Sequence, residues 1–224
     1  MNLATVVQHA SKPFLMPQAT PTVFVVDDDI SVRESLESLI RCAGWRPEVF
    51  ASAGEFLSYP RTPTPSCLVL DVGLPDLNGL DLQKRIALDR IDIPIIFITG
   101  AGDIPMSVQA MKAGAVEFLE KPVSEDVLLG VIGNAIERSQ ITLGHQEKLR
   151  AIRDSYASLT PREREVMALV VAGRPNKRIG GELGISVITV KTHRGNVMRK
   201  MKADSLADLV KMAMRLRLPI APKA

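Results

Sequence analysis

The sequence has few of the features that mark secreted or membrane-spanning proteins. Its 224 residues include two cysteines, one tryptophan and two tyrosines. Two cysteines, neither of them in a C-x-x-C pair, are too few for a stapling disulfide framework. The longest strongly apolar runs, 22–26 and 93–98, are strand-sized and fall far short of the ~20 residues of a membrane span. Residues 1–21 lack the basic start and apolar stretch of a secretion signal. We therefore expect a reduced, cytoplasmic protein that does not associate with membranes.

A large net charge of one sign is also missing, but the two ends of the chain differ. The formal net charge is +3. Residues 1–140 carry 11 basic and 18 acidic side chains, whereas residues 141–224 carry 17 basic and 7 acidic ones. This asymmetry favours two domains with different electrostatic tasks, and a basic end suits a polyanion such as nucleic acid. A merely basic solvated surface would have the same composition, so charge alone does not decide.

Short apolar or β-rich runs alternate with helical patterns from residue 22 to about residue 137. The candidate strands are 22–27, 46–50, 66–71, 94–99 and 115–119, and the candidate helices lie near 31–43, 52–58, 79–89 and 104–113, with a fifth from Ser124. Ser31 and Ser52 are expected to cap their helices, in capping boxes with Glu34 and Glu55. Five such units predict an α/β domain with a flavodoxin-like, doubly wound parallel sheet.

The remainder of the chain is helical in pattern. Residues 138–157 are polar and helix-permissive, with Gly144 as the weak point, and predict a helical linker or a partly frayed tether. Four helices follow over residues 158–217, with expected N-caps at Thr160, Asn176, Ser186 and Ser205. A short helix, a turn at Gly184 and a longer basic helix are typical of a helix-turn-helix. Residues 1–21 and 218–224 are expected to be tails.

Polar side chains stand at the ends of four of the predicted strands. Asp27 and Asp28 stand at the end of the first strand, Asp71 at the end of the third and Thr99 at the end of the fourth, and Lys121 follows the fifth. Ligands bind at the carboxyl ends of strands in such sheets. The carboxylates predict a site for Mg²⁺ or Mn²⁺, with Asp71 as a nucleophile toward a phosphoryl group. Lys121 and Thr99 would bind the oxygens of the transferred group.

At these positions the sequence resembles the receiver domain of bacterial two-component response regulators, over about residues 22–137. The matching segments are Val25-Val26-Asp27-Asp28, Asp71-Val72-Gly73-Leu74-Pro75 with Gly79, Thr99-Gly100 and Lys121-Pro122. The resemblance implies that Asp71 accepts a phosphoryl group from a sensor histidine kinase. It also implies Mg²⁺ held by Asp28, Asp71 and the backbone carbonyl of Gly73, with Asp27 acting through water.

The same resemblance implies how the domain would respond to phosphorylation. The Lys121–Pro122 peptide is expected to be cis and to aim the lysine at the pocket. Thr99 and the aromatic residue three positions before the lysine, here Phe118, are expected to move together as a switch. Many receivers carry tyrosine at this position, and phenylalanine retains the packing but not the hydroxyl.

The C-terminal segment resembles the LuxR/FixJ-type DNA-binding domain over about residues 155–217. The resemblance is carried by Leu159-Thr160-Pro161-Arg162-Glu163, Asn176-Lys177, Leu183-Gly184-Ile185-Ser186, Thr189-Val190-Lys191-Thr192-His193 and Lys200-Met201. At ~100° per residue, one side of the helix over 187–202 is apolar and packs on its neighbours. The opposite side carries Lys191, Thr192, Gly195, Asn196 and Arg199.

The types of these side chains suit contacts with double-stranded DNA. Lys191 can reach guanine acceptors, Asn196 can pair with adenine, and the Thr192 methyl can touch thymine. Gly195 lets the helix approach the groove closely. Phosphate positioning is expected from Asn176, Lys177, Thr189 and Lys200.

We therefore predict a transcriptional response regulator rather than an enzyme, one that catalyses only its own phosphoryl transfer and dephosphorylation. Phosphorylation is expected to change the surface at 106–114 and Phe118, so that a homodimer binds two half-sites of promoter DNA. RNA polymerase is an expected partner. One alternative is a phosphorylation-independent DNA-binding protein with a scaffold receiver. Another is a Mg²⁺-dependent phosphatase of the haloacid-dehalogenase type, although Gly73 stands where that class has a second aspartate.

Overall fold

The computed structural model describes residues 20–89, 92–100 and 104–218. The predicted tails, 1–21 and 218–224, lie almost entirely outside these residues. The chain divides into two compact units after Ile141, which are treated separately below. No helix within the described ranges has the length and apolarity needed to cross a membrane.

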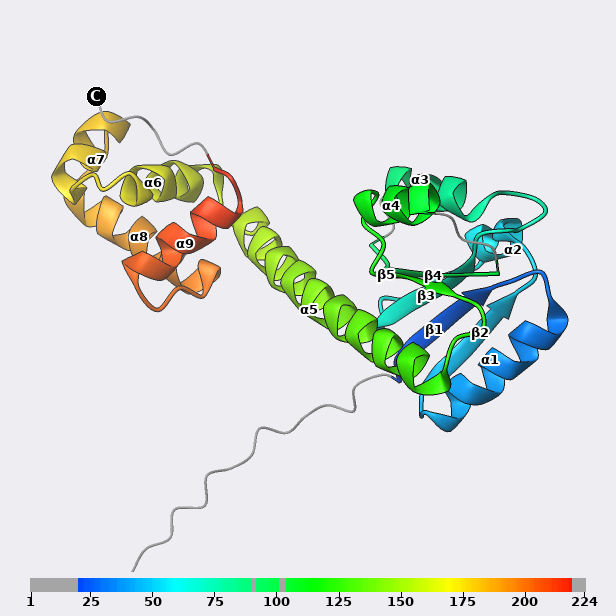
Figure 1. The fold of residues 1–224 in the computed structure, drawn as a ribbon. Helices are drawn as coiled ribbons and strands as arrows, with labels where there is room; N and C mark the ends of the chain where they lie inside the picture. The colour runs from blue at the N-terminus through cyan, green and yellow to red at the C-terminus, as the bar shows by residue number, and fades with distance from the viewer. Residues whose placement is uncertain (1–19, 90–91, 101–103, 219–224) are drawn as a thin grey trace, which may run out of the picture. The chain divides into compact units, whose positions relative to one another are not determined.

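The first unit is built on a five-stranded parallel sheet with the order β2-β1-β3-β4-β5 (Figure 1). The strands are β1 (Thr22–Val26), β2 (Arg46–Phe50), β3 (Ser66–Asp71), β4 (Ile95–Thr99) and β5 (Glu117–Glu120). β1, β3 and β4 are buried along their whole length except at the first residue of β3, as expected for strands that are covered on both faces. This confirms the predicted flavodoxin-like α/β fold.

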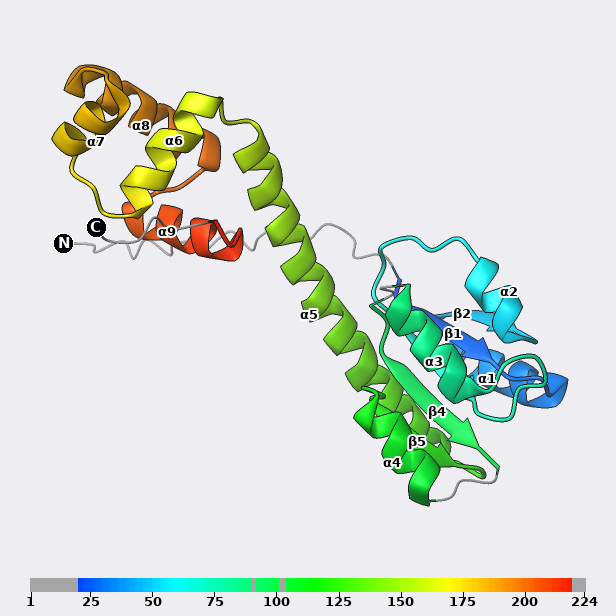
Figure 2. The same cartoon turned by 90° about the horizontal axis from the view of Figure 1, so that it is seen from above.

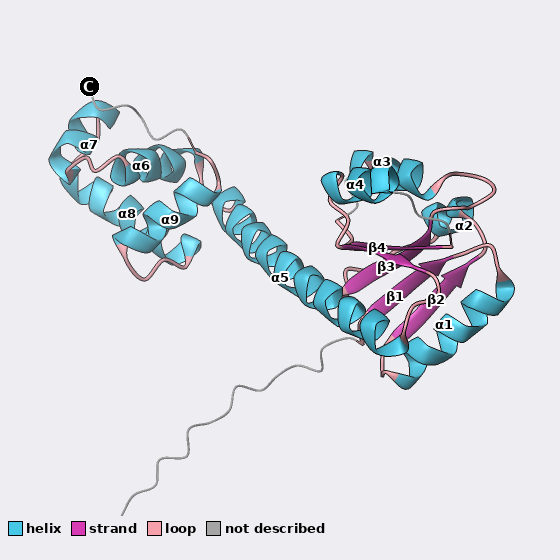
Figure 3. Ribbon diagram, in the orientation of Figure 1, coloured by secondary structure: helices cyan, strands magenta, loops and turns pink. Residues whose placement is uncertain are grey.

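Helices cover both faces of this sheet. They are α1 (Ile30–Cys42), α2 (Ala53–Ser58), α3 (Gly79–Leu88), α4 (Ile104–Lys112) and the start of α5 (Glu125–Ala157). Alternate side chains of each strand point to opposite faces, so Val23 and Val25 belong to one apolar core while Phe24 and Val26 belong to another. Figure 3 shows α3 and α4 on one side of the sheet and α1 on the other.

Two predicted details at the helix starts are wrong. Asp29, not Ser31, caps α1, because the Asp29 carboxylate accepts both the Ser31 N–H at 2.8 Å and the Ser31 hydroxyl at 2.6 Å. Ser52 does cap α2, but the Glu55 carboxylate accepts from the N–H of Ala51 rather than from that of the cap residue.

The last strand of the sheet also begins later than predicted. β5 begins at Glu117 rather than at Ala115 because the Ala115 N–H still bonds to the Ala110 carbonyl at the end of α4, at 3.1 Å. The backbone of Ala115 thus completes the preceding helix instead of joining the sheet.

The segment predicted as a linker forms one continuous helix with the fifth helix of the sheet domain. α5 runs without a break for 33 residues and passes through Gly144. Its first part is anchored by Leu128 and Ile132, which are buried against the sheet. The Ser139 hydroxyl accepts a 3.1 Å hydrogen bond from the N–H of Ser66 at the start of β3. Burial of this kind outweighs the ~1 kcal/mol cost of one glycine in a helix.

The second unit is all helical, with α6 (Pro161–Val171), α7 (Asn176–Leu183), α8 (Val187–Met201) and α9 (Leu206–Arg215) (Figure 2). The predicted caps at Thr160, Ser186 and Ser205 are confirmed. Asn176 is instead the first residue of α7, and Pro175 occupies the cap position without a side-chain hydrogen bond.

A glycine-bearing turn joins α7 to α8, as predicted for a helix-turn-helix. Gly184 closes α7 with φ +65, a conformation that favours glycine. Gly180 of α7 packs directly beneath this turn, since a Cβ atom there would lie 2.7 Å from the Ile185 carbonyl oxygen. The close approach fixes α8 against α7.

Candidate functional site

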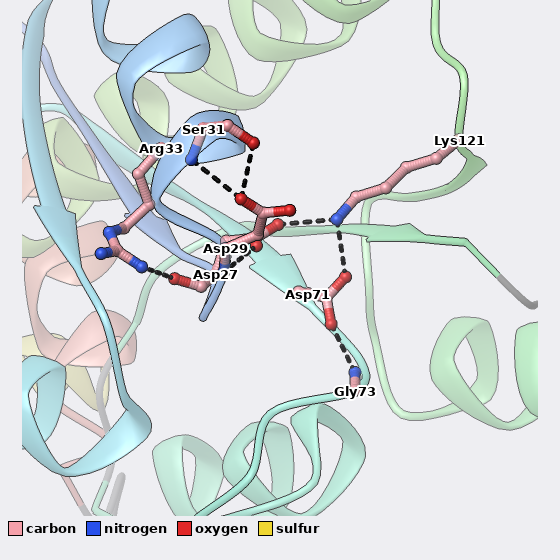
Figure 4. Close-up of polar contacts among 7 residues, drawn as sticks. All are labelled: Asp27, Asp29, Ser31, Arg33, Asp71, Gly73 and Lys121. Carbon is pink, nitrogen blue, oxygen red and sulfur yellow. Dashed lines mark hydrogen bonds and ion pairs between the residues drawn. The ribbon is translucent and has the colours of Figure 1, made fainter.

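The carboxyl ends of β1, β3, β4 and β5 bring four predicted residues to one edge of the sheet. Asp27, Asp71 and Thr99 are 3%, 9% and 5% exposed. The Lys121 ammonium group donates to Asp27 Oδ2 at 2.7 Å and to Asp71 Oδ1 at 3.0 Å (Figure 4). The N–H of Lys121 also bonds to the Thr99 carbonyl at 2.8 Å. Asp28 lies in the same loop as Asp27 and is exposed.

The chain that follows β1 holds Asp27 in place. Its Oδ1 atom accepts the N–H of Asp29 at 3.0 Å, and the Arg33 guanidinium donates to its backbone carbonyl at 2.7 Å. The Ser31 hydroxyl and N–H lower the pKa of Asp29, so this N-cap remains ionised. Sequence reasoning missed Asp29 and Arg33. The run of three aspartates before a helix was the only available signal for the cap.

The loop after β3 is held by contacts to Asp71 and to α2. The Asp71 Oδ2 atom accepts the Gly73 N–H at 2.5 Å. The Asp76 carboxylate accepts the N–H groups of Ala53 and Gly54 at 3.3 and 3.0 Å. Although burial opposes ionisation, these hydrogen bonds keep the pKa of Asp76 below its ordinary value. Asp76, which sequence reasoning missed, therefore ties the loop that carries Gly73 to the start of α2.

Lys121 is held in the pocket as a cation. Burial disfavours its charge, but hydrogen bonds to Asp27 and Asp71 outweigh that cost and raise its pKa. The Lys121–Pro122 peptide is cis, as the resemblance implied.

The oxygen donors of the pocket suit a hard divalent cation. Mg²⁺ takes one or two carboxylates and keeps several waters, and Asp27, Asp28 and Asp71 provide carboxylates at this edge. In the described part of the chain, no three His, Cys, Asp or Glu side chains form a ready metal cluster. Because Mg²⁺ keeps several waters, these carboxylates need to supply only part of its coordination.

The predicted switch residue Phe118 lies half-buried on β5, on the face of the sheet that α3 and α4 cover. Its ring centroid is 6.0 Å from that of Phe97. The Thr99 side chain is buried at the end of the neighbouring strand. The structure thus places both predicted switch residues on adjacent strands, and their movement stays a prediction.

In the second unit, α8 has the two sides that the sequence predicted. Val190, Val197 and Met201 are buried in the core of this unit. The opposite side exposes Lys191, Thr192, Gly195 and Arg199, while Asn196 is half-buried and accepts from Arg199 at 3.2 Å. A helix with one apolar side and one basic side is what major-groove docking requires.

The residues predicted to contact phosphates differ in how far their polar groups are already engaged. Lys177 is exposed at the start of α7. The amide oxygen of Asn176 accepts from Arg194 at 3.2 Å, and the hydroxyl of Thr189 lies 2.8 Å from that of Ser186. Contact of these residues with DNA stays a prediction.

Lys200, the fourth of these residues, forms an ion pair inside the unit. Its ammonium group donates to the buried Glu163 carboxylate at 2.6 Å and to the Ser158 carbonyl at 3.3 Å. The same Glu163 oxygen accepts the N–H of Thr160 at 2.8 Å. Hydrogen bonds from Lys200 and Thr160 lower the pKa of Glu163. The structure therefore gives Lys200 a partner that the sequence did not indicate.

Comparison with known proteins assigns families to both units. Residues 23–133 match the response regulator receiver domain, and residues 157–213 match the LuxR family of bacterial regulatory proteins. The chain is 50% identical to nodulation protein W of Bradyrhizobium diazoefficiens over 191 residues, which cover 85% of this chain and 84% of that protein. It is 42% identical to the transcriptional regulatory protein FixJ of the same organism, over 86% and 94% of the two chains. A solved structure of the response regulator StyR is 46% identical, covers 88% of this chain and 100% of its own, and superposes with a TM-score of 0.80.

Proposed function

Because this chain belongs to the bacterial response regulators that join a receiver domain to a LuxR-type DNA-binding domain, we propose that Asp71 is its phosphoacceptor. Regulation by phosphorylation is the norm of the family, which consists of transcriptional regulators rather than classical enzymes. The observation that carries the proposal is the position of the Lys121 ammonium group between the buried carboxylates of Asp27 and Asp71.

In the proposed reaction an Asp71 carboxylate oxygen attacks the phosphorus of a kinase phosphohistidine. The O–P bond forms as the P–N bond breaks, and the imidazole leaves with its electron pair. Lys121 and the Gly73 N–H lie within hydrogen-bond distance of Asp71, which supports their proposed role in binding the oxygens of the new phosphoryl group. The buried Thr99 hydroxyl group is the third proposed donor.

Receiver domains generally bind Mg²⁺ at this site. Here Asp28, Asp71 and the Gly73 carbonyl would hold the ion, and Asp27 would act through a water molecule. When bound, the ion offsets the negative charge that gathers between Asp71 and the incoming group.

We propose that phosphorylation promotes pairing of two chains through α4 and β5. The apolar side chains of Ile104, Val108 and Met111 are 80%, 45% and 44% exposed on α4. Their spacing of four and three residues puts them on one face of the helix. This exposed stripe supports a pairing surface that includes the predicted segment 106–114 and Phe118.

Pairing would deliver two α8 helices to the two half-sites of a promoter. The second half-site is then bound at a high effective concentration, which raises affinity without new contacts. A sensor histidine kinase, promoter DNA and RNA polymerase are the proposed partners. We place the chain in the cytoplasm because its DNA target is there.

Substitution of Asp71 by asparagine tests this proposal most directly. We expect the wild-type chain, incubated with a small acyl-phosphate donor and Mg²⁺, to gain the mass of one phosphoryl group. Asp71→Asn should lose this gain entirely, whereas Asp81→Asn, at an exposed aspartate that pairs with Lys84 on α3, should keep it.

Sedimentation and DNA binding of the same samples test the later steps. The phosphorylated wild type should sediment as a dimer and bind promoter DNA more tightly, and Asp71→Asn should do neither. An unmodified Asp71 would refute the phosphoacceptor assignment. An unmodified monomer that binds promoter DNA just as tightly would favour a scaffold receiver.

A further inference from the structure

The first turn of α8 exposes two aliphatic side chains, of which Ile188 points away from the core and Val187 lies at the edge of the buried side. Ile188 is 78% exposed and Val187 is 40% exposed. At 100° per residue, Ile188 falls within about 20° of both Gly195 and Arg199. Ile188 therefore lies at the centre of the DNA-facing side, although the chemistry of DNA recognition first directs attention to the polar side chains.

Three hydroxyl groups near Ile188 form hydrogen bonds within the helix. The Ser186 hydroxyl accepts the Thr189 N–H at 3.1 Å, and the two hydroxyls share a 2.8 Å hydrogen bond. The Thr192 hydroxyl bonds to the Ile188 carbonyl at 3.2 Å. Beside these engaged hydroxyls, the Ile188 side chain and the methyl group of Thr192 one turn later form an apolar surface.

We infer that Ile188 is a specificity-determining residue that reads the C5-methyl group of thymine. Thymine presents its C5-methyl group in the major groove, and an apolar side chain that contacts this methyl group distinguishes thymine from the other bases. The N-terminal residues of a recognition helix are the ones that reach base edges. Two turns further along, Gly195 adds no side chain, so the helix can approach the groove closely enough for Ile188 to touch a base.

The charges around this aliphatic group favour DNA over an apolar protein partner. Lys191 and Arg199 are exposed on the same side of α8, and residues 142–224 carry 17 basic and 7 acidic side chains. An isolated exposed isoleucine is otherwise unremarkable. Its position in a basic surface on the second helix of the helix-turn-helix gives it a specific role.

The test replaces thymine by deoxyuridine, which lacks only the methyl group. Duplexes are first selected from a random library with the phosphorylated full-length chain, and each thymine is then replaced in turn. We expect one position in each half-site where deoxyuridine weakens binding about fourfold, the factor that corresponds to one buried methyl group. Ile188→Ala should weaken binding of the thymine duplex at least as much and should no longer distinguish thymine from deoxyuridine there.

Ile141→Ala is the matched control, because Ile141 is an exposed isoleucine of α5 outside the DNA-binding helices. It should preserve the thymine preference. The inference fails if deoxyuridine costs the wild type nothing at every position, or if Ile188→Ala discriminates as the wild type does; the side chain would then serve another partner. The inference depends on the proposed function, and a chain that selects no duplex at all would overturn both.

Discussion

Lys121 in the first unit and Lys200 in the second make similar contacts with different surroundings. Their side chains are 28% and 29% exposed, and both ammonium groups lie against carboxylates that are at most 10% exposed. Lys121 lies between two acids, Asp27 and Asp71. Lys200 lies against Glu163 alone, and that acid is held in addition by the backbone of Thr160.

The difference indicates that the contacts of Lys121 can be replaced by those of another ion or group, whereas the Lys200–Glu163 ion pair is a permanent structural contact. Two carboxylates that share one lysine keep an excess negative charge, which a metal ion or a new phosphoryl group can rearrange. The charge of Glu163 is balanced by Lys200, and its carboxylate also accepts the backbone N–H of Thr160 in a complete capping box. The first arrangement suits chemistry, and the second holds α8 against α6.

Substitution of each lysine should give the largest effect that distinguishes the two sites. Lys121→Met leaves Asp27 and Asp71 as uncompensated neighbours, and we expect the free energy of unfolding to fall by about 3 kcal/mol at neutral pH without Mg²⁺. Millimolar Mg²⁺ should restore more stability to this variant than it adds to the wild type, because the ion replaces the missing positive charge. Urea denaturation with and without Mg²⁺ measures both effects.

Lys200→Met is the matched control. It should also lower the free energy of unfolding, because a buried Glu163 loses its partner, but Mg²⁺ should add no more stability to it than to the wild type. Equal Mg²⁺ responses of the two variants would mean that the Asp27–Asp71 pair has no special affinity for a cation.

Close backbone packing distinguishes two adjacent glycines of α7. A Cβ atom on Gly180 would lie 2.7 Å from the Ile185 carbonyl oxygen, whereas one on Gly181 would meet nothing within 4 Å. We expect Gly180→Ala to cost about 2 kcal/mol of unfolding free energy and to weaken DNA binding, because the turn before α8 must shift. Gly181→Ala should instead gain up to about 1 kcal/mol of unfolding free energy from helix propensity.

Thermal denaturation and DNA titration of the two variants measure these effects. Mass spectrometry should show that both variants still accept a phosphoryl group, since the change lies in the second unit. Equal stability of the two alanine variants would show that the turn between α7 and α8 can shift without loss of unfolding free energy.

The sequence could predict that the polar residues of the pocket lie close together, because their proximity depends on the topology of the sheet. Parallel strands present their carboxyl ends at one edge, so a polar residue after each strand is sufficient to locate a site. The choice of helix cap was harder. Asp29 and Ser31 are both good caps, and the outcome depends on the Ser31 hydroxyl bonding to Asp29, which no spacing rule contains.

The DNA-facing surface was less predictable because its details depend on tertiary partners. Lys200 was predicted to contact a DNA phosphate. Its partner Glu163 lies 37 residues away in sequence, so a local pattern does not show the ion pair. Ile188 was not predicted, because polar side chains are the ones that sequence patterns mark as DNA contacts. Its proposed role rests on its exposure and its position on α8, which the structure describes.

The smallest expected effect concerns the salt dependence of DNA binding, which separates Lys200 from Lys177. The side chain of Lys177 is exposed at the start of α7, so it can release a counterion when it meets a phosphate. Lys177→Met should therefore weaken binding and reduce the slope of log affinity against log salt by about 1.

Lys200→Met should leave that slope unchanged, since its ammonium group is already neutralised by Glu163 2.6 Å away. Any loss of affinity would then come from a displaced α8 and should be reproduced by Glu163→Gln, which weakens the same pair from the other side. Fluorescence anisotropy over a series of salt concentrations measures the slopes. A slope that falls equally for Lys177→Met and Lys200→Met would mean that Lys200 leaves Glu163 to contact a DNA phosphate. The Lys200–Glu163 ion pair would then be replaceable, like the contacts of Lys121 with Asp27 and Asp71.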